Sequence, residues 1–231
     1  KNSKIILCKT FYDTSYENYD VFPAKGKNII DEYGFRCNNE NLGLNSDIEE
    51  CKYPKEKPND EYRIFLVGGS TMFSSNNDNS QTTSALLEKK ILESNIDKKV
   101  KVINAGVSGS WSEQEVKLVT EKIVDFKPNL IVAYDGYNDS SYNVDADVWK
   151  KRWSEVCDIG KMKGFEVIVL LQPFNFSGYK ILTDTERKFL EDGSLNDRLT
   201  LYENYRKQLP EIAQNCYGAY DLSHIFDKFE G

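Results

Sequence analysis

The sequence contains one histidine, His224, in 231 residues, and its five cysteines include no C-x-x-C pair. Zinc sites are built mainly from closely spaced cysteine and histidine ligands, so we expect no zinc centre. The sequence also lacks a run of eighteen apolar residues, so no membrane-spanning helix is expected in this chain. The G-x-x-x-x-G-K-[ST] pattern of phosphate-binding loops is missing as well.

A concentration of positive charge is also absent. The chain has 30 basic and 37 acidic residues and a net charge of -7. Lysines such as Lys89 and Lys90 stand beside Glu88 and Glu93, which predicts a solvated helix face. Proteins that bind nucleic acids normally have a basic patch, so a nucleic acid partner is not expected.

The cysteines leave the cellular compartment open. Cys37 and Cys51 bracket a short Asn-rich loop and could form a disulfide if the protein is exported. Cys157 and Cys216 fall in helical patterns, which predicts small buried apolar side chains. Asn175-Phe176-Ser177 is a glycosylation acceptor in an exported protein. These features weakly favour an exported or cell-surface protein, whose upstream signal or anchor would precede Lys1.

The chain divides near residue 60. Residues 1–60 have scattered aromatic side chains without periodicity and are expected to form an arm packed on the domain. From residue 61 to residue 231, short apolar runs alternate with helical patterns, which predicts a parallel sheet covered by helices on both faces. The predicted strands are Ile64–Val67, Val100–Asn104, Leu130–Tyr134, Val167–Leu171 and Ala219–Leu222.

The helical segments have recognisable starts and faces. Ser112-x-x-Glu115 and Thr183-x-x-Glu186 match the capping box and predict helix N-termini. Further helices are predicted over Thr82–Ser94, Val148–Lys163 and Tyr202–Asn215. Within Val148–Lys163, Trp149 and Trp153 lie on one face and are expected in the core rather than in a sugar-binding surface.

Chemically useful residues follow the predicted strands. The first strand is followed by Gly69-Ser70-Thr71, the second by Gly106, the third by Asn138 and the last by Asp221 and His224. Because ligands of parallel α/β sheets bind at the carboxyl ends of the strands, these residues are expected to converge on one edge.

This set of residue types suits acyl transfer. A serine such as Ser70 attacks a carbonyl carbon when a base removes its proton. The backbone N–H groups of Ser70 and Gly106 and the side-chain amide of Asn138 could donate to the resulting oxyanion. A histidine oriented by an aspartate would serve as the base.

Several of these segments together resemble the SGNH (GDSL-like) hydrolase superfamily. Gly68-Gly69-Ser70-Thr71 is similar to its first block, with Gly69 where the family usually has aspartate. Asn104–Gly109 resembles the second block, which supplies a glycine, and Gly136–Asp139 matches the G-x-N-D block. Leu171–Pro173 looks like the strand end of the fourth block. The resemblance covers residue 60 to the end of the chain.

The resemblance implies a three-layer α/β/α, flavodoxin-like fold whose five parallel strands have the order 2-1-3-4-5. It also implies hydrolysis of an ester or O-acetyl group, possibly on a glycan, without metal or cofactor. The expected partner is a small-molecule or glycan ester, and the oligomeric state is left open. Two alternatives remain: a catalytically impaired binding or structural module on the same fold, and an O-acetyltransferase.

The last block has two interpretations. Asp221-Leu222-Ser223-His224 fits the family's D-x-x-H spacing, so Asp221 and His224 are provisional catalytic residues. Its position directly after the final strand instead resembles the segment that precedes D-x-x-H in relatives, and the working pair would then lie beyond Gly231. Thr71, Tyr137 and Phe174 are predicted to line the substrate pocket.

Overall fold

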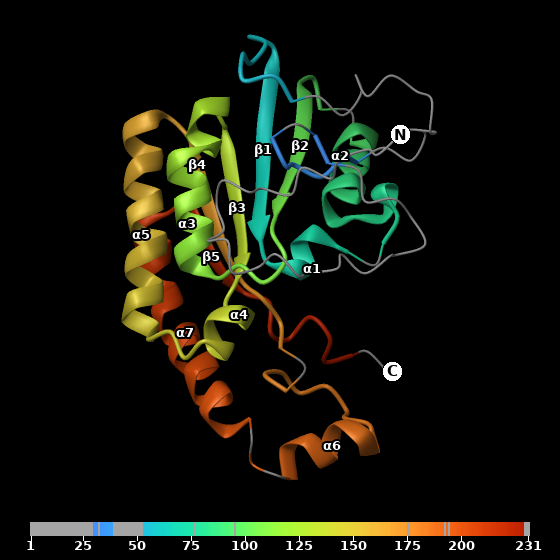
Figure 1. Ribbon diagram of the computed structural model, residues 1–231, viewed down its shortest axis with the longest axis vertical. Helices are drawn as coiled ribbons and strands as arrows, with labels where there is room; N and C mark the ends of the chain where they lie inside the picture. The colour runs from blue at the N-terminus through green and yellow to red at the C-terminus, as the bar shows by residue number, and fades with distance from the viewer. Residues whose placement is uncertain are drawn as a thin grey trace, which may run out of the picture.

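We describe the protein from a computed structural model (Figure 1). The described residues are 30–31, 33–38, 53–75, 77–94, 96–174, 176–191, 193 and 195–228. Residues 30–31, 33–38 and 53–60 are therefore the part of the predicted arm that can be located. Cys51 and Asn175 lie outside the described residues, so the Cys37–Cys51 disulfide and the glycosylation acceptor stay predictions.

The centre of the domain is a five-stranded, fully parallel sheet with the order β2-β1-β3-β4-β5. This confirms the predicted flavodoxin-like topology and the five predicted strands. The strands are slightly longer than their apolar cores because polar residues extend most of their ends. Their bounds are Glu61–Gly68 (β1), Lys99–Gly106 (β2), Leu130–Asp135 (β3), Glu166–Leu171 (β4) and Gly218–Asp221 (β5).

Helices cover both faces of the sheet, which completes a three-layer α/β/α architecture (Figure 1). Side chains alternate along β1: Phe65 and Val67 belong to the larger core, and Ile64 and Leu66 belong to the smaller one. The smaller core is covered by α2 (Thr83–Glu93). The larger core is covered by α3 (Ser112–Glu121), α5 (Ala146–Lys163) and α7 (Asn196–Asn215).

Shorter helices were not predicted, except for the one that begins after Thr183. Two of them, α1 (Ser70–Phe73) and α4 (Tyr137–Ser141), follow directly after β1 and β3 at the carboxyl edge of the sheet. They are too short to show an amphipathic period. The others are η3 (Asn79–Gln81), η4 (Ile123–Phe126) and α6 (Asp184–Glu191).

The two predicted capping boxes differ in outcome. At α6 the box forms: Thr183 N–H donates to Glu186 Oε2 at 2.8 Å, and Glu186 N–H donates to Thr183 Oγ1 at 3.3 Å. At α3 the helix begins as predicted, but the box is wrong. Glu115 instead turns into the interior, where Ser110 Oγ donates to its Oε1 at 2.8 Å.

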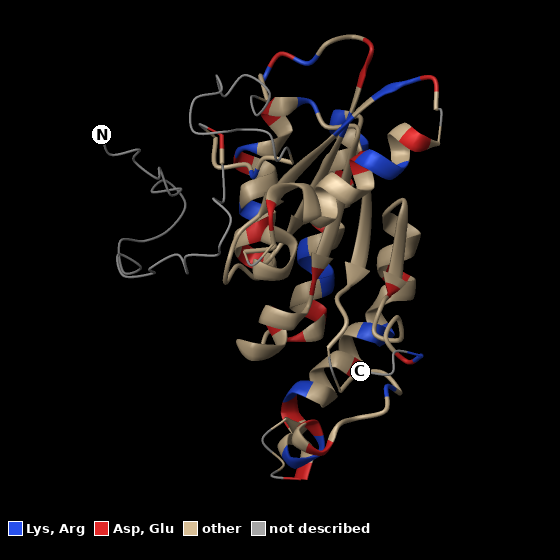
Figure 2. Cartoon of the chain, turned by 90° about the vertical axis from the view of Figure 1, so that its right-hand side faces the viewer, with Lys and Arg blue, Asp and Glu red and all other residues tan. Residues whose placement is uncertain are grey.

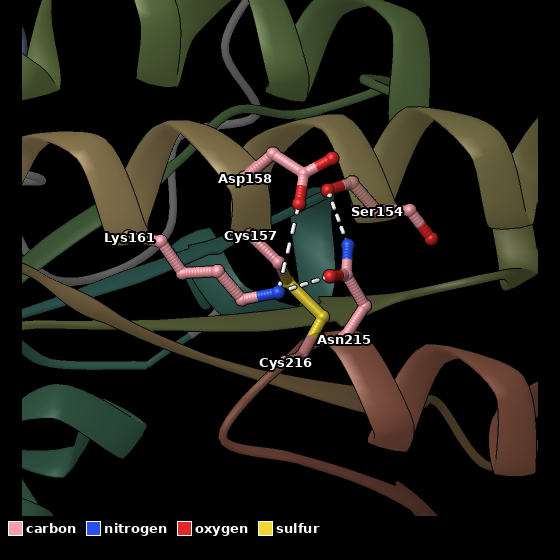
Figure 3. The surroundings of a disulfide bond; sticks show 6 residues. All are labelled: Ser154, Cys157, Asp158, Lys161, Asn215 and Cys216. Carbon is pink, nitrogen blue, oxygen red and sulfur yellow. Dashed lines mark hydrogen bonds and ion pairs between the residues drawn. A yellow bond between two sulfur atoms is a disulfide. The ribbon is translucent and has the colours of Figure 1, made fainter.

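Cys157 is buried in the core, as predicted, and Cys216 is partly buried against it. The prediction of two separate apolar side chains was wrong, because the two residues form a disulfide (Figure 3). Cys157 lies on α5 and Cys216 follows α7, so the bond joins these two neighbouring helices near the amino end of β5. Asn215 Nδ2 donates to the backbone oxygen of Ser154 at 3.0 Å beside it. Cys37 is also disulfide-bonded.

Charges of both signs are spread over the helices and loops (Figure 2). Among the described residues, no helix has the length and apolar character needed to cross a membrane.

Candidate functional site

Ser70 lies where β1 ends and α1 begins. β1 ends at Gly68, Gly69 precedes the helix, and Ser70 is the first helical residue. Its side chain is exposed, although the strand before it is buried. The strand–glycine–serine pattern therefore places a hydroxyl at the carboxyl edge of the sheet, as the sequence predicts.

Asn138 lies on α4, which follows β3, the strand beside β1. Its side chain reaches the turn that precedes Ser70. Its Nδ2 donates to the backbone oxygen of Ser110 at 2.5 Å. The same nitrogen is 2.5 Å from the position that a Cβ would occupy at Gly69. The turn before Ser70, the loop after β2 and the start of α4 thus meet around one amide group. A side chain at position 69 would displace that amide, which accounts for the glycine in this chain.

Gly106 has a different environment from the one predicted. Its N–H donates to Asn104 Oδ1 at 3.0 Å, so this N–H already has an acceptor. A Cβ at this position would lie 2.4 Å from the backbone nitrogen of Phe73. Glycine is therefore required here because α1 packs directly on the end of β2, and the predicted donor role of Gly106 lacks an available N–H.

Gly109 is the alternative glycine in the same loop. It has a φ of +80°, and a Cβ would meet nothing within 4 Å. In the described part of the chain, no acceptor is found for its N–H. It directly precedes Ser110, whose backbone oxygen accepts from Asn138. The sequence offers both glycines after the second strand, and only the local hydrogen bonds distinguish them.

Three buried carboxyl groups lie behind this site: Glu115, Asp135 and Asp139. Ser112 holds Asp139 through its N–H, at 2.9 Å from Oδ2, and through its hydroxyl. Burial, followed by the charge of Asp135, raises the pKa of Asp139 to about 9. The same two causes raise the pKa of Glu115 well above its usual range. A pKa of about 9 leaves Asp139 protonated at neutral pH, and burial favours the protonated form of Glu115 as well.

Asp135 is held by two tryptophans. The Nε1 groups of Trp149 and Trp153 both donate to its Oδ2, each at 2.9 Å. Both indoles are fully buried, which confirms their predicted place in the core. The two indoles also fix the carboxylate of Asp135, which lies shortly before α4.

The three predicted pocket residues differ in their exposure to solvent and in their contacts. Thr71 is exposed, and its Oγ1 accepts from Gln172 Nε2 at 3.0 Å. Tyr137 is partly exposed and Phe174 is buried, with their ring centroids 5.6 Å apart. The guanidinium of Arg198 lies 4.5 Å from the Tyr137 centroid and 4.7 Å from that of Phe174. These two rings therefore contact a cation from α7.

Sequence reasoning missed Trp111 as a residue of this edge. Trp111 directly follows Ser110, and its ring centroid lies 4.1 Å from that of Tyr142. The only signal in the sequence was its position directly after the second block.

The provisional pair of Asp221 and His224 is not formed. Asp221 Oδ2 accepts from Arg206 Nε at 2.7 Å, and its Oδ1 accepts from the N–H of Ser223. The ring of His224 instead pairs with Asp227, with Nδ1 2.9 Å from Oδ2. Within the described residues, no hydrogen bond joins His224 to Ser70. The D-x-x-H spacing was thus misleading, because a turn after β5 directs the two side chains to different partners.

No group of three or more histidine, cysteine, aspartate or glutamate side chains in the described residues could hold a metal ion. A surface hollow lies at the opposite edge of the sheet, where Tyr62, Lys99 and Asn129 contribute to its walls. That hollow involves the amino ends of β1 and β2 and takes no part in the Ser70 site.

Comparisons with known proteins identify the fold. No family model matches the sequence, and no curated protein matches it. Solved structures do match: TesA has 18% identity and a TM-score of 0.54, covering 73% of this chain and 82% of TesA. AlinE4, an SGNH-hydrolase family esterase, has 16% identity and a TM-score of 0.52, covering 75% and 82%. The acetyl xylan esterase AlAXEase has 18% identity and a TM-score of 0.54, covering 72% and 80%. The chain therefore has the SGNH (GDSL-like) hydrolase fold.

Proposed function

We propose that this protein is a serine hydrolase of the SGNH type that cleaves an ester or O-acetyl group. One observation carries the proposal: the amide of Asn138 lies against the turn that presents Ser70 and contacts the loop that contains Gly109. Three separate segments thus supply a hydroxyl and hydrogen-bond donors at one edge of the sheet. An SGNH-hydrolase family esterase and an acetyl xylan esterase are among the matching structures, which supports the same class of reaction.

In the proposed reaction, Ser70 Oγ attacks the ester carbonyl carbon, and a new C–O bond forms to the serine. The bond between the carbonyl carbon and the alcohol oxygen then breaks, and the proton of Ser70 passes to that oxygen, so that the alcohol leaves neutral. The acyl group is then transferred from Ser70 to water, which releases the acid and restores the hydroxyl. The oxyanion would accept from the N–H of Ser70, the N–H of Gly109 and the Asn138 amide. Ser70 is the first residue of α1, where an N–H has no intrahelical acceptor. Asn138 Nδ2 has a second hydrogen besides the one directed at Ser110.

His224 has no place in this proposal. Its ring is held by Asp227, and its centroid lies 4.9 Å from that of Tyr179. The proposal for the nucleophile and the oxyanion donors stands independently of this residue.

An acylated glycan suits the rim of the site. Trp111 and Tyr142 form an aromatic pair beside the loop that contacts Asn138, and aromatic faces pack well on sugar rings. Two of the matching structures are named as acetyl xylan and acetyl-xylooligosaccharide esterases. The disulfide bonds at Cys157–Cys216 and at Cys37 are typical of proteins that fold in an oxidising compartment.

The direct test compares Ser70→Ala with Ser94→Ala. Ser94 is exposed at the end of α2, where its hydroxyl donates to the backbone oxygen of Ile91 at 2.6 Å, so it serves as the matched control. We expect the wild type and Ser94→Ala to hydrolyse p-nitrophenyl acetate and to be labelled by a fluorophosphonate. Ser70→Ala should do neither. A folded wild type that shows no label on Ser70 would contradict the proposal.

A second candidate is a module that binds an acylated ligand without cleaving it. The pairing of His224 with Asp227, rather than with Ser70, favours this function. Acetylated xylooligosaccharide would then bind the wild type and Ser70→Ala equally, without release of acetate. Calorimetry and acetate release, measured on the same samples, distinguish the two candidates.

A further inference from the structure

Arg36 is a fully buried arginine that comes from the segment before the domain. Its backbone N–H donates to the oxygen of Asn104 on β2 at 2.9 Å, which holds this segment beside the sheet. Its guanidinium then continues past β2 toward α1. A residue far from Ser70 in the sequence thus ends next to the nucleophile's own helix.

Every hydrogen bond found for the guanidinium goes to the segment that follows Ser70. Nη1 donates to the backbone oxygens of Phe73 and Ser74. Nη2 donates to the oxygen of Asn77 at 2.5 Å, and Nε donates to Asn79 Oδ1 at 3.4 Å. The guanidinium carbon also lies 5.2 Å from the ring centroid of Phe73.

These contacts supply hydrogen-bond donors to the carboxyl end of α1. The last carbonyl groups of a helix have no intrahelical donor, and four residues are too few for a helix to be stable alone. Asn104 Nδ2 donates to the oxygen of Met72 at 3.0 Å, and Arg36 serves the next two carbonyls. Ser74 ends the helix with a φ of 59°, a left-handed conformation that non-glycine residues rarely adopt. External contacts must therefore hold this end.

We propose that Arg36 is a positioning residue for Ser70: it fixes the carboxyl end of α1 and the turn after it, and so holds the hydroxyl in register with Asn138. This inference rests on the proposed function. It assigns Arg36 no contact with substrate.

The charge of Arg36 suits this position. Burial lowers the pKa of Arg36 to about 10, which still leaves the guanidinium protonated at neutral pH. A cation at the carboxyl end of a helix is favourable because that end carries a partial negative charge. A lysine at this position would keep the charge, but its compact ammonium cannot span carbonyls that lie on different turns of the chain.

Arg63 provides a matched control. It is also fully buried, and it lies near the amino end of β1. Its Nε donates to Glu61 Oε1 at 2.5 Å, and its Nη1 donates to the oxygen of Phe126 at 2.9 Å. Replacing either arginine by lysine removes a comparable set of buried hydrogen bonds, but only Arg36 contacts the segment after Ser70.

The experiment compares Arg36→Lys with Arg63→Lys in the full chain. We expect similar decreases in melting temperature. Fluorophosphonate labelling of Ser70 should slow about 10- to 100-fold in Arg36→Lys, the loss expected from a displacement of about 1 Å, and less than twofold in Arg63→Lys. Amide hydrogen exchange over residues 70–79 should rise at least tenfold in Arg36→Lys alone.

Equal slowing of labelling in the two variants, or unchanged exchange over residues 70–79 in Arg36→Lys, would overturn the inference. If Arg36→Lys does not fold, Asn79→Ala removes the acceptor of Arg36 Nε and should raise exchange over the same residues at least twofold; no rise would overturn the inference. If the wild type is never labelled, the proposed function fails. The exchange data then still decide whether Arg36 holds α1.

Discussion

The two ends of β1 each have a buried arginine, but the partners of the two arginines differ. Near the amino end, Arg63 pairs with the carboxylate of Glu61. At the carboxyl end, the hydrogen bonds found for Arg36 go to neutral oxygens of the segment after Ser70. The arginine at the amino end thus forms an ion pair within its own strand. The carboxyl end uses equivalent buried contacts to hold a short helix whose first side chain is exposed.

The largest effect is expected at Asn138, and Asn129, at the opposite edge of the sheet, is its control. Asn138→Ala removes a proposed oxyanion donor, so kcat for p-nitrophenyl acetate should fall about 100- to 1000-fold. Asn129, at the amino edge, accepts from the N–H of Arg63 and from Lys57 Nζ, each at 2.8 Å. Asn129→Ala should lower the free energy of unfolding by about 1 kcal/mol and leave kcat within twofold. Equal losses of kcat would remove the distinction between the two edges.

The next effect distinguishes the two glycines after β2. An alanine Cβ at position 106 would lie 2.4 Å from the nitrogen of Phe73, so α1 must shift. Gly106→Ala should cost about 1–3 kcal/mol of stability and slow the labelling of Ser70 at least tenfold. Gly109→Ala meets no neighbour, and its φ of +80° should cost about 1 kcal/mol. Chemical denaturation measures both, and a fully stable Gly106→Ala would show that α1 does not need this close packing.

A smaller effect concerns pH. The pKa of Asp139 in the folded protein is raised from the ordinary 3.8 to about 9, so between these values the folded state binds more protons than the unfolded state. The contribution of Asp139 to the free energy of unfolding is therefore fully present below about pH 4, and it is lost as the pH rises toward about 9. Asp139→Asn should make the free energy of unfolding less dependent on pH in this range.

The control for that prediction is Asp125→Asn, which changes an exposed carboxylate paired with Lys55 at 3.0 Å. This variant should keep the pH slope of the wild type. Urea unfolding at several pH values measures both slopes, and an unchanged slope in Asp139→Asn would contradict the assigned protonation.

The smallest effect is expected at His224. Its ring contacts Asp227 and Tyr179 rather than Ser70, so His224→Asn should leave the rate of ester hydrolysis within twofold. Loss of activity in this variant would bring the residue back as the base, and it would show that the turn after β5 rearranges when substrate binds.

The layers of the fold could be predicted because their signal is local. Each strand is an apolar run with polar ends, and each long helix shows its period. The positions of Ser70 and Asn138 followed from the same reasoning, because a residue after a parallel strand lies at the carboxyl edge.

Other features depended on contacts that a sequence does not display. Arg36 lies in a stretch without periodicity, and its acceptors are about forty residues further along the chain. The side chain of Glu115 had two possible partners, and burial against Ser110 decided between them. The helices α1 and α4 are held by their surroundings rather than by propensity, so no local pattern marks them.

The disulfide between Cys157 and Cys216 has a practical consequence for limited digestion. The bond closes a loop of the chain, with a sequence separation of 59, that includes α6 and its flanking segments, which extend away from the sheet (Figure 1). A protease that cuts once near α6 would leave two fragments still joined through sulfur. The nicked protein should migrate as one band on a gel without reductant and as two bands after reduction.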